Sequence, residues 1–228
     1  MSSDDSTPPD KLDKLHDFST DAITVTWSKR RCIHAAECVR GLPDVFAPGE
    51  RPWIHPEQAD ANAIARVVER CPTGALHHQR HDGGAPEATP DTNAIRVTRN
   101  GPLHVRGDVE LVAPDGRVIL RDTRVALCRC GDSANKPFCD NRHLLKRFMD
   151  RGEVFEGGVR AANGDEGRTL RIEASRNGPL KLSGPLAVVS ADGRVVLEGA
   201  GASLCRCGQS RNKPFCDGSH TDAGFGSE

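Results

Sequence analysis

The sequence predicts an α+β chain in two parts: a small mixed module first, then a mostly-β unit made by internal duplication. Three observations predict this. An alternating stretch at residues 23–27 precedes a helical pattern at 58–70. Residues 99–143 recur as 176–220 without a gap, and the copies are identical at 25 of 45 positions. Each copy carries an Asp-Gly pair between apolar runs, which is typical of a β-hairpin. Two copies of one structural unit follow.

The first module is expected at residues 21–80, after a Ser-, Asp- and Pro-rich stretch at 1–20 that predicts a disordered tail. Residues 23–27 alternate as a strand does. A helix is expected over 58–70, because Ile64, Val67, Val68 and Cys71 fall on one helical face. Pro72 and Gly74 end it. Residues 81–93, rich in Gly, Pro and Asp, are interpreted as a linker.

The duplicated part divides into a first unit at 94–150, a connector at 151–170, a second unit at 171–222 and a short tail at 223–228. Within the first unit, residues 109–112 and 117–120 are apolar-rich runs on either side of Asp115-Gly116. This pattern predicts short strands joined by turns, and the second unit repeats it.

Composition excludes several classes of protein. The 31 basic and 32 acidic residues nearly cancel, so no charge field favours nucleic acid. No apolar run reaches the length of about 20 residues that a membrane helix needs, and the N-terminus has no signal-like apolar stretch. We therefore expect no membrane association and a cytoplasmic location. The nine cysteines are an odd count, which together with that location argues against a disulfide framework.

Each repeat carries four potential metal ligands in the pattern C-x-C-x8-C-x3-H. Cysteines two apart on an extended strand project to one face, and a Cys and a His at the end of the pattern sit about one helical turn apart. Three thiolates and an imidazole suit either zinc or an iron–sulfur cluster, and spacing alone leaves both open. Packing alone is a poor explanation, because the array repeats intact within Gly-rich polar loops. The predicted ligands are Cys128, Cys130, Cys139 and His143, and Cys205, Cys207, Cys216 and His220.

The second array, running from Cys205 to the Cys-Asp-Gly-Ser-His run at 216–220, resembles the CDGSH iron–sulfur domains of the mitoNEET type. The resemblance implies a 2Fe–2S cluster in each repeat, with the first two cysteines on one iron and the Cys–His pair on the other. It also implies that the repeats pair within the chain as a pseudo-two-fold unit. The first repeat departs from the motif at Asn141, which replaces a glycine, although Asn tolerates a left-handed backbone better than most residues.

A third cysteine group lies in the first module. Bacterial ferredoxins carry C-x2-C-x2-C and a distant Cys-Pro. Here the three clustered positions of that pattern hold Cys32, Ala35 and Cys38, so the middle cysteine is replaced by alanine. The distant Cys-Pro pair is Cys71-Pro72. Residues 21–78 resemble a divergent mono-cluster ferredoxin-like family, which implies a 4Fe–4S cluster. Three thiolates also suffice for 3Fe–4S, and His34 or water could complete a 4Fe–4S site, so both cluster types stay open. A third alternative is that the module has lost its cluster and has only a structural role.

The sequence therefore predicts an iron–sulfur protein that transfers electrons, or stores and delivers clusters, with two 2Fe–2S clusters and one 3Fe–4S or 4Fe–4S cluster. A redox- or acid-sensing cluster donor and a zinc-binding interaction protein are the alternatives. We find no catalytic motif and expect no enzyme. The expected partner is a redox protein or an apo-protein acceptor, with the chain itself a monomer. Five further histidines have no partner at ligand spacing and are predicted to lie at the surface: His55, His77, His78, His81 and His104.

Overall fold

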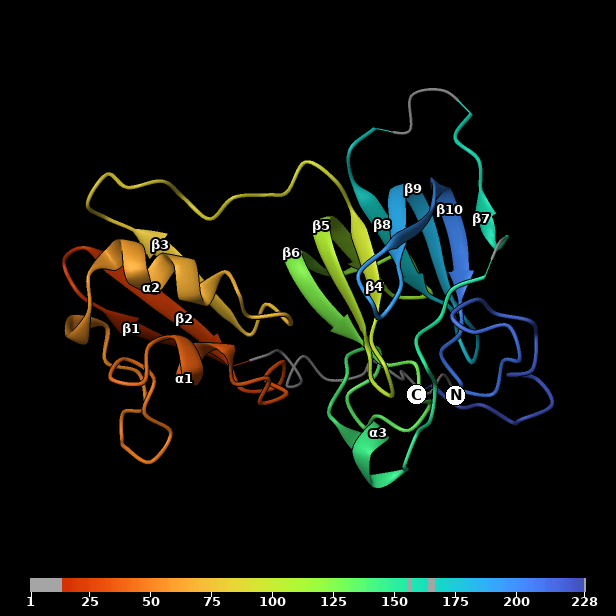
Figure 1. Ribbon diagram of the computed structural model, residues 1–228, viewed down its shortest axis with the longest axis horizontal. Helices are drawn as coiled ribbons and strands as arrows, with labels where there is room; N and C mark the ends of the chain where they lie inside the picture. Colours follow the sequence, from red (N-terminus) through yellow and green to blue (C-terminus); the bar gives the residue numbers. More distant parts are fainter. Residues whose placement is uncertain (1–13, 156, 164–166, 228) are drawn as a thin grey trace, which may run out of the picture.

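The computed structural model describes residues 14–155, 157–163 and 167–227 (Figure 1). The chain is mostly β, and its helices are few and short. The first module is an antiparallel sheet in the order β1-β2-β3, with a 3₁₀ turn at Pro56–Gln58 and two helices beside it. Its elements are β1 (Leu15–Ser19), β2 (Ile23–Ser28), α1 (Glu37–Gly41), α2 (Ala61–Val68) and β3 (Leu76–Arg80).

The prediction that residues 1–20 form a disordered tail is wrong for β1. Leu15–Ser19 pairs along its whole length with β2, and Phe18 packs against the core of the module. This polar strand is ordered by backbone hydrogen bonds to its neighbour, a contribution that its own composition does not reveal. The first module therefore begins earlier than residue 21. Residues 1–13 of the predicted tail lie outside the described residues.

The predicted strand and helix of this module are confirmed with shifted boundaries. The helix begins at Ala61, because the Asp60 side chain accepts hydrogen bonds from the backbone N–H groups of Asn62 and Ala63. Its buried face, which includes Ile64 and Val68, packs on the sheet. The helix thus ends three residues before Cys71.

The repeats form equivalent strands. In the first repeat these are β4 (Ala94–Val97), β5 (Leu103–Val112) and β6 (Val118–Leu127), and in the second β8 (Leu170–Ala174), β9 (Leu180–Val189) and β10 (Val195–Leu204). The predicted hairpins are therefore real but longer than expected. A four-residue helix, α3 (Arg142–Leu145), follows the last cysteine of the first repeat.

Each repeat gives a strand to the other. β4 pairs antiparallel with β5 of its own repeat and parallel with β9, whereas β8 pairs antiparallel with β9 and parallel with β5. The four strands close a ring, and one apolar core fills it with side chains from both repeats. This reciprocal pairing is the pseudo-two-fold arrangement that the family resemblance implied. β6 and β10 extend the sheet from β5 and β9.

The two hairpin edges then differ. β10 carries a short strand, β7 (Val159–Arg160), which lies within the predicted connector at 151–170. β6 lies toward the first module instead, as Figure 1 shows. Within the parts of the chain that the structure describes, no helix is both long and apolar enough to cross a bilayer.

Candidate metal centres

The predicted ligands of each repeat come together as two pairs. Cys128 Sγ lies 3.7 Å from Cys130 Sγ, and Cys139 Sγ lies 3.5 Å from His143 Nδ1. The second repeat reproduces these distances at 3.7 and 3.4 Å in the pairs Cys205–Cys207 and Cys216–His220. Among the described residues, no three His, Cys, Asp or Glu side chains gather around one point as a single ion requires.

These separations fit two ligands on one tetrahedral metal. With metal–sulfur bonds near 2.3 Å and metal–nitrogen bonds near 2.0–2.1 Å, two sulfurs lie about 3.8 Å apart and a sulfur and a nitrogen about 3.6 Å apart. The residues present therefore fit a group with two metal atoms, one for each pair. Which residue binds which metal stays a prediction.

The loop between the two pairs is built by the same contacts in both repeats. The Ser133 hydroxyl donates to the Phe138 carbonyl at 2.7 Å, and Asp140 accepts from the Ala134 N–H at 2.8 Å. Ser210 and Asp217 do the same in the second repeat. Asp140 also accepts from the N–H of Arg142, which starts the short helical turn before His143. The Asp that follows the third cysteine therefore fixes the angle between the Cys and the His.

The arginine inside each C-x-C turn is a structural anchor that the sequence reasoning passed over. Arg129 is 1% exposed and donates to the Gly101 carbonyl at 2.7 Å and to Asp150 at 2.6 Å. Arg206 donates likewise to the Gly178 carbonyl at 3.0 Å. This anchor could have been detected in the sequence, because both repeats contain an Arg between the two cysteines and the Arg-Asn-Gly-Pro-Leu run that this Arg contacts.

Burial opposes ionisation of these thiols in the absence of a cation. It raises the pKa of Cys139 and of Cys205 to about 11 each. A bound metal supplies the positive charge that allows such thiolates to form together. The two sites differ in accessibility, since Cys139 and His143 are buried whereas Cys216 and His220 are half-buried.

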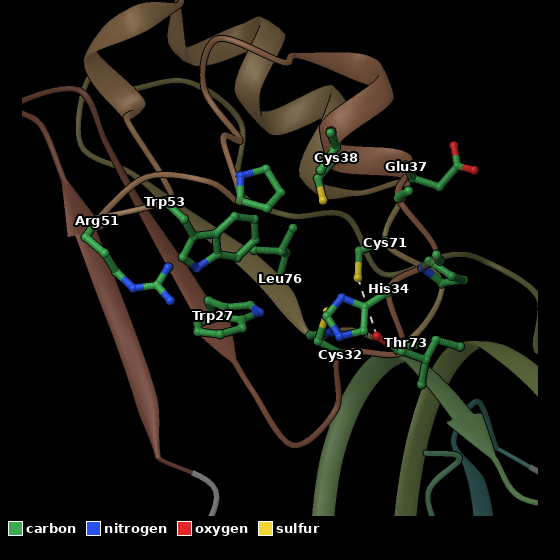
Figure 2. A pocket seen from close by; sticks show the side chains of 17 residues that line it. Trp27, Cys32, His34, Glu37, Cys38, Arg51, Trp53, Cys71, Thr73 and Leu76 are labelled. Atoms are coloured by element: carbon green, nitrogen blue, oxygen red, sulfur yellow. Dashed lines mark hydrogen bonds between the residues drawn. The ribbon is translucent and has the colours of Figure 1, made fainter. Parts of the chain in front are cut away.

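The three cysteines of the first module line one pocket of about 400 Å³. Cys32 follows β2, Cys38 lies in α1 and Cys71 precedes β3, so three separate segments bring them together. Figure 2 shows them along one side of the pocket, with the indoles of Trp27 and Trp53 beside them. Burial, together with the nearby thiols of Cys71 and Cys32, raises the pKa of Cys38 to about 11.

This pocket carries signs of a missing acceptor. The indole nitrogens of Trp27 and Trp53 are buried and have no hydrogen-bond partner among the described residues, which is unusual for a donor shielded from water. The acid-labile sulfides of an iron–sulfur cluster would accept from such donors. Ala35, at the position where the ferredoxin pattern has its middle cysteine, lines the pocket. His34 and Ala36 on either side of it have φ angles of 54° and 62°. The loop thus holds two non-glycine residues in a left-handed backbone beside the cysteines.

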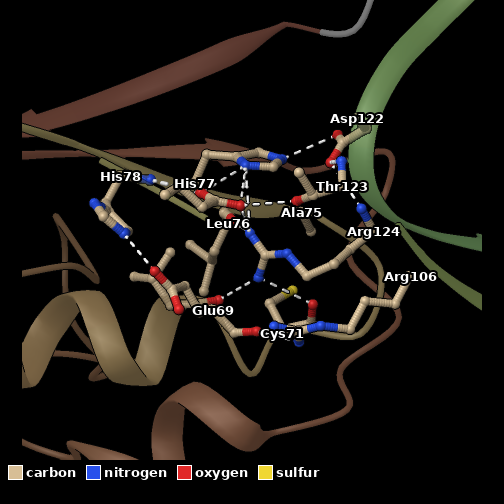
Figure 3. A network of polar contacts seen from close by, with 12 residues as sticks. Glu69, Cys71, Ala75, Leu76, His77, His78, Arg106, Asp122, Thr123 and Arg124 are labelled. Carbon is tan, nitrogen blue, oxygen red and sulfur yellow. Dashed lines mark hydrogen bonds and ion pairs between the residues drawn. The ribbon is translucent and has the colours of Figure 1, made fainter. Parts of the chain in front are cut away.

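A buried polar network, which the sequence did not predict, joins the first module to β6 (Figure 3). Arg124 donates to the carbonyls of Val68 at 2.6 Å, Leu76 at 3.0 Å and Cys71 at 3.2 Å, and it pairs with Glu87 of the linker. Beside it, Arg31 pairs with Asp122 at 2.6 Å. Arginine's fixed fork of donors suits such a convergence of acceptors.

His77 sits between the two carboxylates of this network, 2.9 Å from Glu87 and 3.0 Å from Asp122. Burial alone would lower the pKa of His77, but hydrogen bonds to Asp122 and Glu87, together with their charges, raise it to about 9. Burial would raise the pKa of each carboxyl, yet the contacts with His77 and the neighbouring arginines lower both to about 2. At neutral pH the junction is a network of charged groups.

The surface prediction for the five other histidines is confirmed only for His81, which is exposed. It is wrong for the other four, since His78 is buried and His55, His77 and His104 are half-buried. His77 belongs to the junction, and the His78 side chain is fully buried against Glu69 at 3.1 Å. Alternation along β3 places successive histidines on opposite faces of the strand, toward β6 and toward α2. Neither contact could be predicted from the residues that neighbour the histidines in the sequence.

Comparisons with known proteins agree with this arrangement. A family described as "Divergent 4Fe-4S mono-cluster" matches residues 18–81, and one described as "Iron-binding zinc finger CDGSH type" matches 100–144 and 177–221. The chain is 32% identical over 62 residues to "Uncharacterized protein YjdI" of Escherichia coli strain K12, and equally to that of strain O157:H7. These residues are 27% of the chain and 82% of the relative. No solved structure matches the chain significantly.

Proposed function

Because the chain belongs to the divergent 4Fe–4S mono-cluster family in its first module and to the CDGSH-type iron-binding family in its repeats, we propose that it is a three-cluster electron-transfer protein. Its domains are those of an iron–sulfur protein. The finer proposal is a 2Fe–2S cluster in each repeat and a 3Fe–4S or 4Fe–4S cluster in the first module. The observation that carries it is the arrangement of each repeat's ligands as two pairs at tetrahedral separations.

The protein's own groups supply the environment of each centre. In the repeats, the backbone N–H of Asn141 lies 3.5 Å from Cys139 Sγ, and that of Gln209 lies 3.4 Å from Cys207 Sγ. Donors directed at thiolate sulfur stabilise the more negative, reduced state and so raise the potential. In the first module the indole N–H of Trp27, on the side of its ring nearer Cys32 in Figure 2, would act in the same way on a bound cluster. Bound clusters supply one-electron chemistry that the side chains lack.

Cluster delivery is the second candidate, and the exposure of the second site favours it. Cys216 and His220 are half-buried, whereas their counterparts in the first repeat are buried. A pocket of about 520 Å³ reaches Cys216 and is lined by Arg160 and Lys181. An apo-protein acceptor would approach this site, as would a redox partner. The nine free thiols suit a reducing cytoplasm, where they stay available for metal.

Anaerobic purification followed by metal and sulfide analysis tests the proposal. We expect visible absorbance, acid-labile sulfide and about seven or eight iron atoms per chain, the sum of two 2Fe–2S clusters and one of three or four irons. Zinc without sulfide or colour would overturn it in favour of a zinc-binding interaction protein. Electron paramagnetic resonance (EPR) then separates 3Fe–4S, paramagnetic when oxidised, from 4Fe–4S, which is paramagnetic when reduced. Transfer of clusters to an apo-ferredoxin tests the delivery role.

A further inference from the structure

Asn141, the residue at which the first repeat departs from the second, connects two of the candidate centres. Its side-chain Nδ2 donates a 2.6 Å hydrogen bond to the carbonyl oxygen of Ile33, the neighbour of Cys32 in the first module. Its backbone N–H lies 3.5 Å from Cys139 Sγ. A path of covalent bonds and two hydrogen bonds therefore runs from Cys139 to Cys32.

A second contact holds the same segment of the first module. Asn135, in the loop of the first repeat, donates to the Arg30 carbonyl at 2.8 Å and accepts from the Arg30 guanidinium at 2.6 Å. The second repeat presents a different surface at its matching motif. A Cβ on Gly218, the counterpart of Asn141, would meet no described atom within 4 Å. The first site is thus covered by the first module, while the second faces outward.

The two repeat sites lie back to back. A Cβ on Gly131 would lie only 2.5 Å from the Cys207 carbonyl oxygen, and a Cβ on Gly208 only 2.8 Å from that of Cys130. The two C-x-C-G turns are therefore in direct backbone contact, and glycine at both positions allows it. The first-repeat site is in contact with both of the others.

We propose that the three sites form one series, in the order first module, first repeat, second repeat, and that Asn141 is the positioning residue that joins the first two. This inference rests on the proposed electron-transfer function. One electron leaves the first-module site, which is oxidised by one, and enters the first-repeat site, which is reduced by one, without a proton transfer or a change of covalent bonds. The second-repeat site, as the exposed end, then passes it to an electron-accepting protein. Among 2Fe–2S centres a histidine ligand raises the reduction potential, which favours the repeat sites as electron acceptors.

The chain offers a matched pair of variants. Asn141→Gly copies the second repeat and suits the left-handed backbone there, where φ is 69°. Gly218→Asn places the same side chain at a position that faces away from the first module and where a Cβ has no neighbour within 4 Å. Asn141→Asp keeps the shape but turns an oxygen toward the Ile33 carbonyl. Iron and sulfide content should match the wild type in all three.

The experiment mixes oxidised holoprotein with dithionite, one electron per chain, and follows the EPR signals of the centres after rapid freezing. In the wild type and Gly218→Asn, the electron should reach its equilibrium distribution before the first sample. In Asn141→Gly and Asn141→Asp, we expect the signals to redistribute slowly between first-module and repeat centres. Hydrogen exchange of the amides at 32–38 should also rise roughly fivefold in Asn141→Gly, the factor for one lost hydrogen bond of about 1 kcal/mol.

Unchanged redistribution in Asn141→Gly, with normal iron, sulfide and reducibility, would overturn the inference and leave the proposed function intact. An equal slowing in Gly218→Asn would also overturn it, because the effect would then not depend on the junction. A wild-type chain without iron and sulfide would instead refute the proposed function, and the inference would fail with it.

Discussion

Replacing Arg124 by methionine should loosen the first module from the repeats. The Arg124 residue is 2% exposed, and its guanidinium serves three backbone carbonyls and the Glu87 carboxylate. Methionine fills similar space but has no donor, so these acceptors lose the hydrogen bonds of the guanidinium. Breaking a buried pair by removing one partner costs about 3–5 kcal/mol. Glu87 keeps its contacts with His77 and Thr123, so we expect the lower end, about 3 kcal/mol.

Urea unfolding of the holoprotein measures this cost. With a slope of about 2–3 kcal/mol per molar urea, a loss of about 3 kcal/mol lowers the midpoint by roughly 1 M. If the module separates before the rest unfolds, the single transition becomes two. Cys71 should then lose its fixed position, because Arg124 holds the Cys71 carbonyl. We therefore expect faster iron loss to a chelator from the first-module centre, followed by EPR.

Arg121→Met is the matched control on the same strand. The Arg121 side chain is 72% exposed and pairs with Glu110 at 2.7 Å, so its loss should cost less than about 1 kcal/mol. Equal urea midpoints for Arg124→Met and Arg121→Met would refute the view that the buried network fastens the module. A lower midpoint without a change in iron retention would refute only the link to Cys71.

Three further outcomes follow. The protonated ring of His77 stabilises the junction fully below about pH 6.5, and this contribution is lost as the pH rises through 9. The urea midpoint of the wild type should therefore fall over that pH range relative to the midpoint of His77→Gln. An equal pH dependence of the two midpoints would contradict this. Asp60→Ala should lower the free energy of unfolding by about 1 kcal/mol through loss of the α2 cap, and an unchanged free energy of unfolding would refute the capping role. His220→Cys should lower the potential of the second centre in an EPR-monitored redox titration, because a thiolate adds negative charge; an unmoved potential would mean that His220 is not a ligand.

Local and repeated signals made the repeats predictable. The Asp-Gly turns mark the hairpins, and the constant offset between copies places every predicted ligand on an equivalent strand or loop. The departure at Asn141 was also interpretable, since its φ of 69° is the left-handed backbone expected where Gly218 has 90°. Each of these features depends on residues close together in the chain.

Features set by distant partners were not predictable. β1 is a polar strand that is ordered by pairing with β2, and His78 is a polar side chain buried by Glu69. Arg124 has acceptors more than forty residues away in the chain, at Val68, Cys71 and Leu76. A single sequence does not show which of its many arginines will meet such acceptors.

The differences between the repeats nevertheless carry the missing information once the fold is known. Asp122, Thr123 and Arg124 of β6 are replaced by Gly199, Ala200 and Gly201 in β10. The first set contacts the module and its linker, whereas small residues in the second let β7 approach, since a Cβ on Gly199 would lie 2.4 Å from the Arg160 carbonyl oxygen. The exchange of Asn141 for Gly218 follows the same division. Where the copies agree they bring the predicted ligands together, and where they disagree at these positions one copy faces the first module and the other does not.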